Sequence, residues 1–201
     1  MAPPKVCNAL RGQKHMGSIL EELAEYPLCQ YEQITTDQIP FSKNVRHICK
    51  TECPRYGTSW SCPPAVGTVE ECRARCLQYK DALIFMTASE VDDMENMDAL
   101  LATRKEHEAV THQLDARFRE EFGDCLTLSS ESCADCAQCA YPSAPCRNPG
   151  RMLPCLEGYG IVAVNLAELC GMPMSMGPGV VVWFGAILFH RVTEKPGVSG
   201  F

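Results

Sequence analysis

The sequence predicts an α/β fold: a small mixed sheet with packing helices and two cysteine-rich loops that bind metal clusters. Apolar runs of strand length at 82–88, 126–128 and 180–189 alternate with segments of helical period, the usual pattern of an α/β protein. A chain of 201 residues with 46% hydrophobic content is long and apolar enough for a packed core. We expect residues 1–40 to form an N-terminal helical segment and residues 41–201 a single α/β domain.

The first helices are expected where apolar side chains recur at helical spacing after a start signal. Residues 17–26 carry such a pattern and predict a short packing helix. Thr68 and Glu71 form a capping box, which predicts the start of another helix. Cys72 and Cys76 lie one turn apart on the apolar face of that helix, so we expect them to be small core residues.

The second half of the chain is expected to supply a long helix, a shorter helix and the last strand. Apolar residues recur every three or four positions through the charged segment 94–122, and Gly123 ends this amphipathic pattern. Residues 156–171 fit a strand or a helix, and the stop signal at Gly171 favours the helix. In the last strand, Gly185 predicts a bulge or a close approach to the backbone.

The composition limits the classes of function. A formal net charge of −7 argues against binding to nucleic-acid phosphates. Fourteen cysteines would suggest disulfides in a secreted protein, but residues 1–10 lack the apolar stretch of a signal peptide. We therefore expect reduced, metal-binding cysteines and a cytoplasmic location. The apolar run 180–189 is too short to cross a bilayer as a helix, so no membrane insertion is expected.

The densest cysteine pattern is the run Cys133-x2-Cys136-x2-Cys139, with Cys146 and Cys155 close downstream. Three thiols at this spacing wrap a short loop around one compact object and are typical ligands of an iron-sulfur cluster. A structural zinc ion prefers two separated cysteine pairs, each on its own knuckle. The longer gap before Cys146 departs from the ferredoxin spacing, so we expect a cluster without a ferredoxin fold. A disulfide knot or free thiols are the alternative.

Another cysteine pattern comes earlier in the chain, at Cys49, Cys53 and Cys62. Prolines directly after two of these cysteines prevent a continuous helix, so the three sulfurs are expected to converge from an irregular loop. The site is then either a zinc site that borrows a fourth ligand or a [4Fe-4S] cluster in which one iron lacks a cysteine. Trp60 either shields this cluster from water or is an ordinary core aromatic.

The fourth ligand of the earlier site is not evident from the spacing. Cys72 or Cys76 could close the site, but we favour an open iron. Such an iron could bind a small thiolate, sulfide or oxyanion, whereas a fully ligated cluster only passes electrons. Arg55 at the earlier site and Arg147 at the later one could balance the negative charge of a cluster or substrate, with solvated arginines as the alternative.

The two cysteine patterns together resemble a known protein family. The residues that carry the resemblance are Cys49, Cys53, Tyr56, Gly57, Trp60, Cys62-Pro63-Pro64, Cys133, Cys136, Cys139, Pro145-Cys146-Arg147, Leu156-Glu157 and Tyr159-Gly160. Over residues 45–190 the sequence is similar to DUF2284, a family of predicted metal-binding proteins found largely in anaerobic bacteria and archaea. The resemblance implies cysteine-bound metal in iron-sulfur form, held by the motif cysteines at 49, 53, 62, 133, 136, 139 and 146. It implies no particular reaction and no role for Cys155.

Three functions fit these observations. The first is electron transfer or redox chemistry in anaerobic metabolism by a protein with two [4Fe-4S] clusters and a redox partner protein. The second is an enzyme that uses the open iron as a Lewis acid or sulfur acceptor for a small-molecule substrate. The third is a zinc-stabilised interaction module. The sequence has neither a phosphate-binding loop nor a complete dinucleotide-binding glycine fingerprint.

Overall fold

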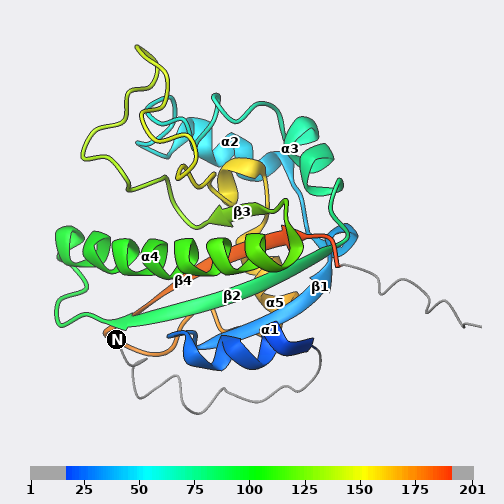
Figure 1. Ribbon diagram of the computed structural model, residues 1–201. Coiled ribbons are helices and arrows are strands. Elements are labelled where there is room, and N and C mark those ends of the chain that lie inside the picture. The colour runs from blue at the N-terminus through cyan, green and yellow to red at the C-terminus, as the bar shows by residue number, and fades with distance from the viewer. Residues whose placement is uncertain (1–16, 192–201) are drawn as a thin grey trace, which may run out of the picture.

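The computed structural model describes residues 17–191 and has a four-stranded sheet at its centre (Figure 1). In chain order the strands are β1 (Gln30–Thr35), β2 (Asp81–Glu90), β3 (Leu126–Ser129) and β4 (Val180–Phe189). They lie side by side in the order β1-β2-β4-β3, and each neighbouring pair is antiparallel. The predicted α/β class, with a small sheet and packing helices, is confirmed.

Among these strands, β1 is the one that the apolar pattern does not predict. It pairs with β2 along its full length at the edge of the sheet. Of its six residues only Ile34 is buried, so its polar composition is tolerated and leaves little apolar signal. The boundary between residues 1–40 and 41–201 stays a prediction, although β1 lies before it and belongs to the same sheet as the later strands.

One face of the sheet is covered by α1 (Gly17–Glu22), the 3₁₀ helix η2 (Leu23–Glu25) and the long helix α4 (Met97–Phe122) (Figure 1). Helix α4 begins after Asn96, whose side chain accepts two backbone N–H groups, and ends at Gly123, where φ is 80°. Both predicted helices on this face are therefore confirmed. The buried cluster between these helices and β2 includes Leu23, Leu83, Phe85, Leu114 and Phe118.

The other face packs against α3 (Val69–Cys76), the 3₁₀ helix η4 (Glu157–Tyr159) and α5 (Ala163–Leu169). The capping box predicted for α3 is present, since the Thr68 side chain accepts the Glu71 N–H and the Glu71 carboxylate accepts the Thr68 N–H. The helix predicted within 156–171 is also present but shorter. The buried cluster on this face includes Cys72, Cys76, Ile84, Met86, Leu156, Ile161 and Leu188.

Gly185 in β4 allows a close approach between two strands. It lies opposite Phe85 of β2, and the Phe85 ring fills the space that a β-carbon at position 185 would need. The close approach predicted for this glycine is confirmed. The same ring stacks on His107 of α4, with ring centroids 5.7 Å apart, so Gly185 helps to position α4 on the sheet.

The two cysteine-rich segments lie together beyond the edge strand β3, in the upper part of Figure 1. The earlier segment follows η3 (Thr36–Gln38) and begins with α2 (Lys43–Thr51), which is capped by Ser42. Cys49 therefore lies in the last turn of a helix, and the expectation of an irregular loop is wrong at this position. The prolines that exclude a helix come only after α2 has ended.

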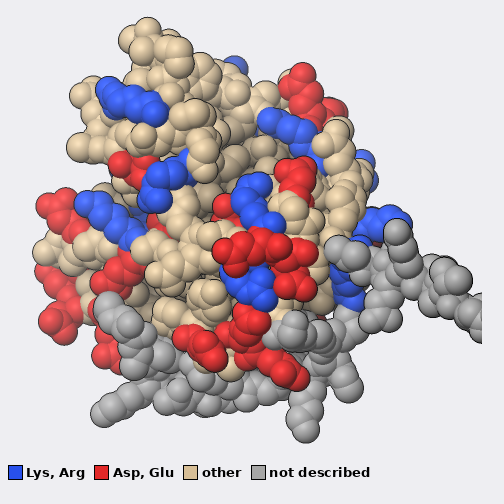
Figure 2. All heavy atoms as spheres, in the orientation of Figure 1, with Lys and Arg blue, Asp and Glu red and all other residues tan. Residues whose placement is uncertain are grey.

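Charged side chains of both signs are mixed over the face shown in Figure 2, and few of them lie over the cysteine loops at its top. Within residues 17–191, no helix combines the length and apolar character needed to span a bilayer. The cytoplasmic location stays a prediction.

Candidate metal centres

Cys49, Cys53 and Cys62 lie in one region of the fold, although not close enough together to hold a single metal ion, and we call them the first group. Cys53 and Cys62 lie close enough to Cys49 for their charges to act on its thiol. Burial raises the pKa of Cys49 to about 11, and the neighbouring Cys53 contributes to this rise. A fourth cysteine, Cys155, adjoins Cys62, and its thiol lowers the pKa of Cys62.

Cys155 adjoins the first group, although in sequence it follows the later cysteine run. It is only 6% exposed, and its backbone N–H donates to the Ser61 carbonyl at 2.9 Å. Its sulfur accepts the Gly158 N–H at 3.3 Å and donates to Glu157 Oε2 at 3.1 Å. Sequence spacing alone carries no signal for this position, because the contact with the first group depends on the fold.

Helix α2 and η4 position the first group by packing on each other. The Arg46 guanidinium on α2 donates to the Gly158 carbonyl. One turn further along α2, Cys49 Sγ lies 4.0 Å from the carbonyl oxygen of Glu157. Gly158 has little room for a side chain, because a β-carbon there would lie 3.1 Å from the β-carbon of Cys155. This close packing holds Cys49 and Cys155 at the same short segment.

Cys133, Cys136, Cys139 and Cys146 form the second group and line one cavity of about 380 Å³. All four are half-buried thiols. The remaining wall comes from their own loop and from residues 55–60 of the earlier segment. The four thiols therefore share one space, as expected if they bind a common object.

Several N–H and O–H groups donate to sulfurs of the second group. Burial raises the pKa of Cys139, but the backbone N–H groups of Tyr141 and Trp60 and the Ser59 hydroxyl outweigh it, so the pKa is lowered. Cys133 also accepts backbone N–H groups, although burial dominates there and raises its pKa. Donors of this kind stabilise thiolates, which are the metal-binding form of cysteine.

Two carboxylates outside the cysteine set hold the second loop in place. Asp135 accepts hydrogen bonds from Arg151 Nε at 2.8 Å and Asn148 Nδ2 at 2.6 Å. The bond from Arg151 lowers the pKa of Asp135. Glu108 on α4 accepts the Ala134 N–H with both oxygens, at 2.9 and 3.0 Å. These contacts fix the loop both internally and to the long helix.

The aromatic and basic residues expected around the clusters lie at the second group. Trp60 and Arg55 line its cavity, although both belong to the earlier segment. Trp60 Nε1 donates to a carbonyl of the later loop at 3.0 Å, and its ring packs edge-on against Tyr141 at 4.8 Å between centroids. Arg147 donates to the Gln138 carbonyl at 2.7 Å, within the same loop.

A buried serine joins the two groups. Ser61 Oγ accepts the Cys133 N–H at 2.8 Å, lies 2.8 Å from Ser59 Oγ and lies 3.8 Å from Cys62 Sγ. The Ser61 carbonyl accepts the Cys155 N–H. The Ser61 side chain, with no exposed surface, therefore contacts both groups. This role is not evident from the sequence, where Ser61 is only a polar neighbour of Cys62.

Residues 32–189 match the model of DUF2284, a family described as predicted metal-binding proteins. This segment is most of the chain and includes both groups and Cys155. The chain belongs to the DUF2284 family. Comparison with curated proteins and with solved structures finds no match for the chain.

The other cysteines near α3 of this DUF2284 protein are core residues. Cys72 and Cys76 have no exposed surface, as predicted from the helical pattern. Cys72 Sγ donates to the Val66 carbonyl at 3.3 Å. Among the side chains of residues 17–191, no set of three or more His, Cys, Asp or Glu lies close enough together to hold a metal ion.

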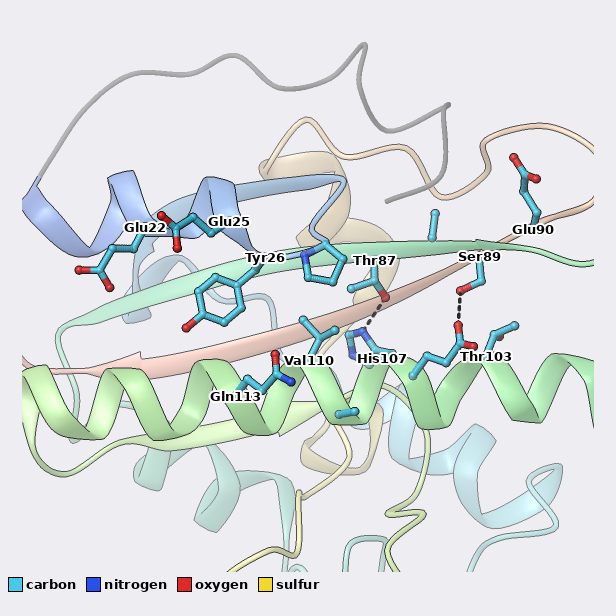
Figure 3. Close-up of a pocket in the computed structure, with 14 residues that line it drawn as sticks. Glu22, Glu25, Tyr26, Thr87, Ser89, Glu90, Thr103, His107, Val110 and Gln113 are labelled. Atoms are coloured by element: carbon cyan, nitrogen blue, oxygen red, sulfur yellow. Dashed lines mark hydrogen bonds between the residues drawn. The ribbon is translucent and has the colours of Figure 1, made fainter. Parts of the chain in front are cut away.

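A separate cavity of about 760 Å³ lies between η2, β2 and α4, on the sheet face opposite η4 (Figure 3). Its walls combine acidic and other polar side chains with apolar ones, and no cysteine lines it. His107 in its wall bonds to Thr87 Oγ1 at 2.8 Å and to the Phe184 carbonyl at 3.1 Å. Complete burial lowers the pKa of His107 to about 3, so its imidazole is neutral near pH 7.

Proposed function

We propose that this protein binds two [4Fe-4S] clusters, one at each cysteine group, and transfers electrons between them and a redox partner protein. The metal-binding description of the family supports the general class of the proposal. The first group would hold one cluster and the second group the other. When bound, such clusters supply one-electron redox chemistry.

The second group fits a cluster better than a single zinc ion. Zinc would draw four sulfurs to about 2.3 Å around one point. A cubane contains its own bridging sulfides, so its thiolate ligands stand farther apart, and the cavity of about 380 Å³ between these cysteines has room for it. The hydrogen bonds to Cys139 and Cys133 are of the type that tunes cluster potentials.

The contact of Ser61 with both groups is the observation that carries the electron-transfer proposal. Ser61 Oγ lies 2.8 Å from Cys133 N and 3.8 Å from Cys62 Sγ. One small buried side chain therefore bridges the two sites. Because electron transfer becomes faster as the protein gap between cofactors shrinks, clusters placed here would form a relay.

The residues around the second cavity suit the surface end of such a relay. Trp60 and Tyr141 cover part of the cavity and would limit the access of water to a cluster. Arg55 and Arg147 would balance its negative charge. All four cysteines of this group are half-buried, which would bring a cluster here near the surface, whereas the first group combines the half-buried Cys49 and Cys53 with the buried Cys62.

Anaerobic reconstitution of the full chain with iron and sulfide tests the proposal. We expect a brown protein whose visible absorption bleaches on reduction, with iron and acid-labile sulfide sufficient for two clusters. Because the groups adjoin, the reduced protein should show EPR signals broadened by spin–spin interaction, and a variant lacking one cluster should lose the broadening. A colourless protein with stoichiometric zinc and no labile sulfide would contradict the proposal and favour the zinc-stabilised interaction module.

A further inference from the structure

We infer that Cys155 is the fourth cysteine ligand of the first cluster, so that this site is closed. The inference rests on the proposed function, because it assigns a ligand to a cluster proposed above. The sequence spacing suggests either an open iron or a site closed by Cys72 or Cys76, and this inference replaces both expectations.

The contacts of the Cys155 thiol support its role as a ligand. Cys155 lies beside Cys62, because its backbone N–H donates to the carbonyl of Ser61 at 2.9 Å and its β-carbon packs with Pro63 against Gly158. Its sulfur accepts the Gly158 N–H at 3.3 Å, the same kind of backbone donation that the second-group sulfurs receive. Backbone donors to sulfur stabilise a ligating thiolate. As a ligand, Cys155 would lose to solvent the proton that it donates to Glu157 Oε2 at 3.1 Å, and its thiolate would bond to iron through Sγ.

The backbone around Cys155 is fixed from two sides. Its N–H donates to the Ser61 carbonyl at 2.9 Å, and it forms an isolated parallel bridge with Ser129 at the end of β3. The next residue, Leu156, donates its N–H to the Ser129 carbonyl at 3.0 Å. The thiol is thus presented to the first group by ordered structure, while Cys49 reaches the same place from α2.

The competing cysteines are engaged elsewhere. Cys72 Sγ donates to the Val66 carbonyl at 3.3 Å and lies 3.2 Å from the Arg75 guanidinium. Cys76 lies one turn later on the same buried face of α3, with no exposed surface. Either thiol could become a ligand only if α3 left the core that it forms with the sheet. Cys155 needs no such rearrangement.

Closure of the first site decides between two kinds of chemistry. With four cysteine ligands no iron remains open for a substrate, so a Lewis-acid or sulfur-accepting reaction has no vacant position there. Outer-sphere electron transfer does not need a vacant coordination position on iron. The inferred ligand therefore favours the electron carrier over the enzyme.

The test compares wild-type protein with Cys155→Ala, and uses Cys72→Ala and Cys76→Ala as matched buried controls. All are reconstituted anaerobically and assayed for iron, sulfide and EPR signals. We expect Cys155→Ala to lose one of the two cluster signals or to convert it to a three-iron signal, and added 2-mercaptoethanol to restore part of it. Both controls should keep both signals. In wild-type protein, cyanide and 2-mercaptoethanol should change neither signal.

Two outcomes would overturn the inference while leaving the proposed function intact. The first is that Cys155→Ala keeps both cluster signals unchanged, or that Cys72→Ala or Cys76→Ala loses the first cluster. The other is a wild-type cluster signal that shifts with cyanide, which would show an open iron even if Cys155→Ala fails to fold. Wild-type protein without iron and labile sulfide would overturn both the proposed function and the inference.

Discussion

The first cysteine group takes one of its members, Cys49, from a helix, whereas the second group lies entirely in a loop. Cys49 projects from α2, and its Sγ lies 4.0 Å from the backbone carbonyl of Glu157. Cys155 adjoins the group from the segment before η4, and its Sγ lies 3.1 Å from the Glu157 carboxylate. The second group surrounds a cavity at the surface, and its sulfurs receive backbone N–H groups. The first group thus has the Glu157 carboxylate near its thiols, whereas the sulfurs of the second group have more N–H and O–H donors, with the Glu108 and Asp135 carboxylates near Cys133.

This difference bears on the direction of electron flow in the proposed relay. Hydrogen bonds to the sulfurs and solvent exposure are among the factors that set a cluster's potential, as is net charge. A nearby carboxylate disfavours the added electron, whereas N–H donors favour it. We therefore expect the second cluster to have the higher potential and to be reduced first.

The largest expected effect is the loss of one cluster without the other. Cys136→Ala removes a thiolate from the second group, so we expect it to lose that cluster and to destabilise the loop, because metal-binding free energy in such a site is also folding free energy. The first cluster should remain. Iron analysis, EPR and thermal unfolding measure these effects.

Cys125→Ala is the matched control for that change. Cys125 is also buried, in the cluster between α4 and the sheet, but it lies outside both groups. It should keep all the iron and cost about 1 kcal/mol of stability, as expected for a small core deletion. Full iron content in Cys136→Ala would remove Cys136 from the ligand set.

The next effect is a difference in thiol reactivity in the metal-free protein. Burial raises the pKa of Cys49 to about 11, whereas N–H and O–H donors hold that of Cys139 below its ordinary value. At a pH between the pKa values of the two thiols, Cys139 is largely thiolate and Cys49 is largely thiol. Cys139 should therefore react with iodoacetamide roughly tenfold to hundredfold faster than Cys49. The rate at Cys139 should level off at lower pH, while that at Cys49 should still rise toward pH 11. Mass spectrometry of time points measures both rates.

Denaturant supplies the control for this comparison, because unfolding removes both environments. The two rates should then become similar. Equal rates in the folded protein would mean that burial at Cys49 and hydrogen-bond donors at Cys139 do not make the two thiols differ in reactivity.

The second group was within reach of sequence reasoning because its ligands are local. Cys133, Cys136 and Cys139 recur every three residues, so one loop brings them together. The position of Cys155 beside the first group could not be predicted from the sequence, because Cys155 adjoins Cys62 only after α2 and η4 have packed. Cysteine spacing is informative for residues close in sequence, whereas Cys62 and Cys155 are far apart in sequence and are brought together by the fold.

The fold shows the same division between local and long-range information. The buried strand β2 and the amphipathic α4 have strong periodic signals and are predicted correctly. Strand β1 has one buried residue and depends on pairing with β2, so its sequence carries little signal. Trp60 follows the same rule, since it lies two residues before Cys62 in sequence but lines the cavity of the second group.

A smaller effect is expected where the two groups meet. Ser61→Ala leaves the partly buried Cys133 N–H without its acceptor, which should cost about 1 kcal/mol of unfolding free energy. Because Ser61 also contacts Cys62, the EPR signals of both clusters should change. Ser175→Ala, at an exposed serine outside both groups that accepts the Gly177 N–H, should change neither. If Ser61→Ala altered only the second cluster, the two groups would be independent and the relay would lose its main support.

The smallest expected effect tests the charge beside the first group. Glu157 Oε2 lies 3.1 Å from Cys155 Sγ, and the Glu157 charge also acts on Cys49 and Cys62. Glu157→Gln keeps the shape of the side chain but removes the negative charge that opposes reduction. We therefore expect the potential of the first cluster to rise by tens of millivolts, on the order of 1 kcal/mol for one electron. The second cluster should move less, because it lies farther from this carboxylate.

Glu52→Gln provides the matched control, because it removes the same charge at an exposed position just after α2. Solvent screening should make its effect on either potential much smaller. Redox titrations followed by EPR at pH 8 measure the two potentials separately. Equal shifts of both clusters in Glu157→Gln, or a shift as large in Glu52→Gln, would mean that Glu157 acts only through the net charge of the protein. A shift confined to the first cluster would instead place that cluster beside Glu157, where Cys155 adjoins the first group.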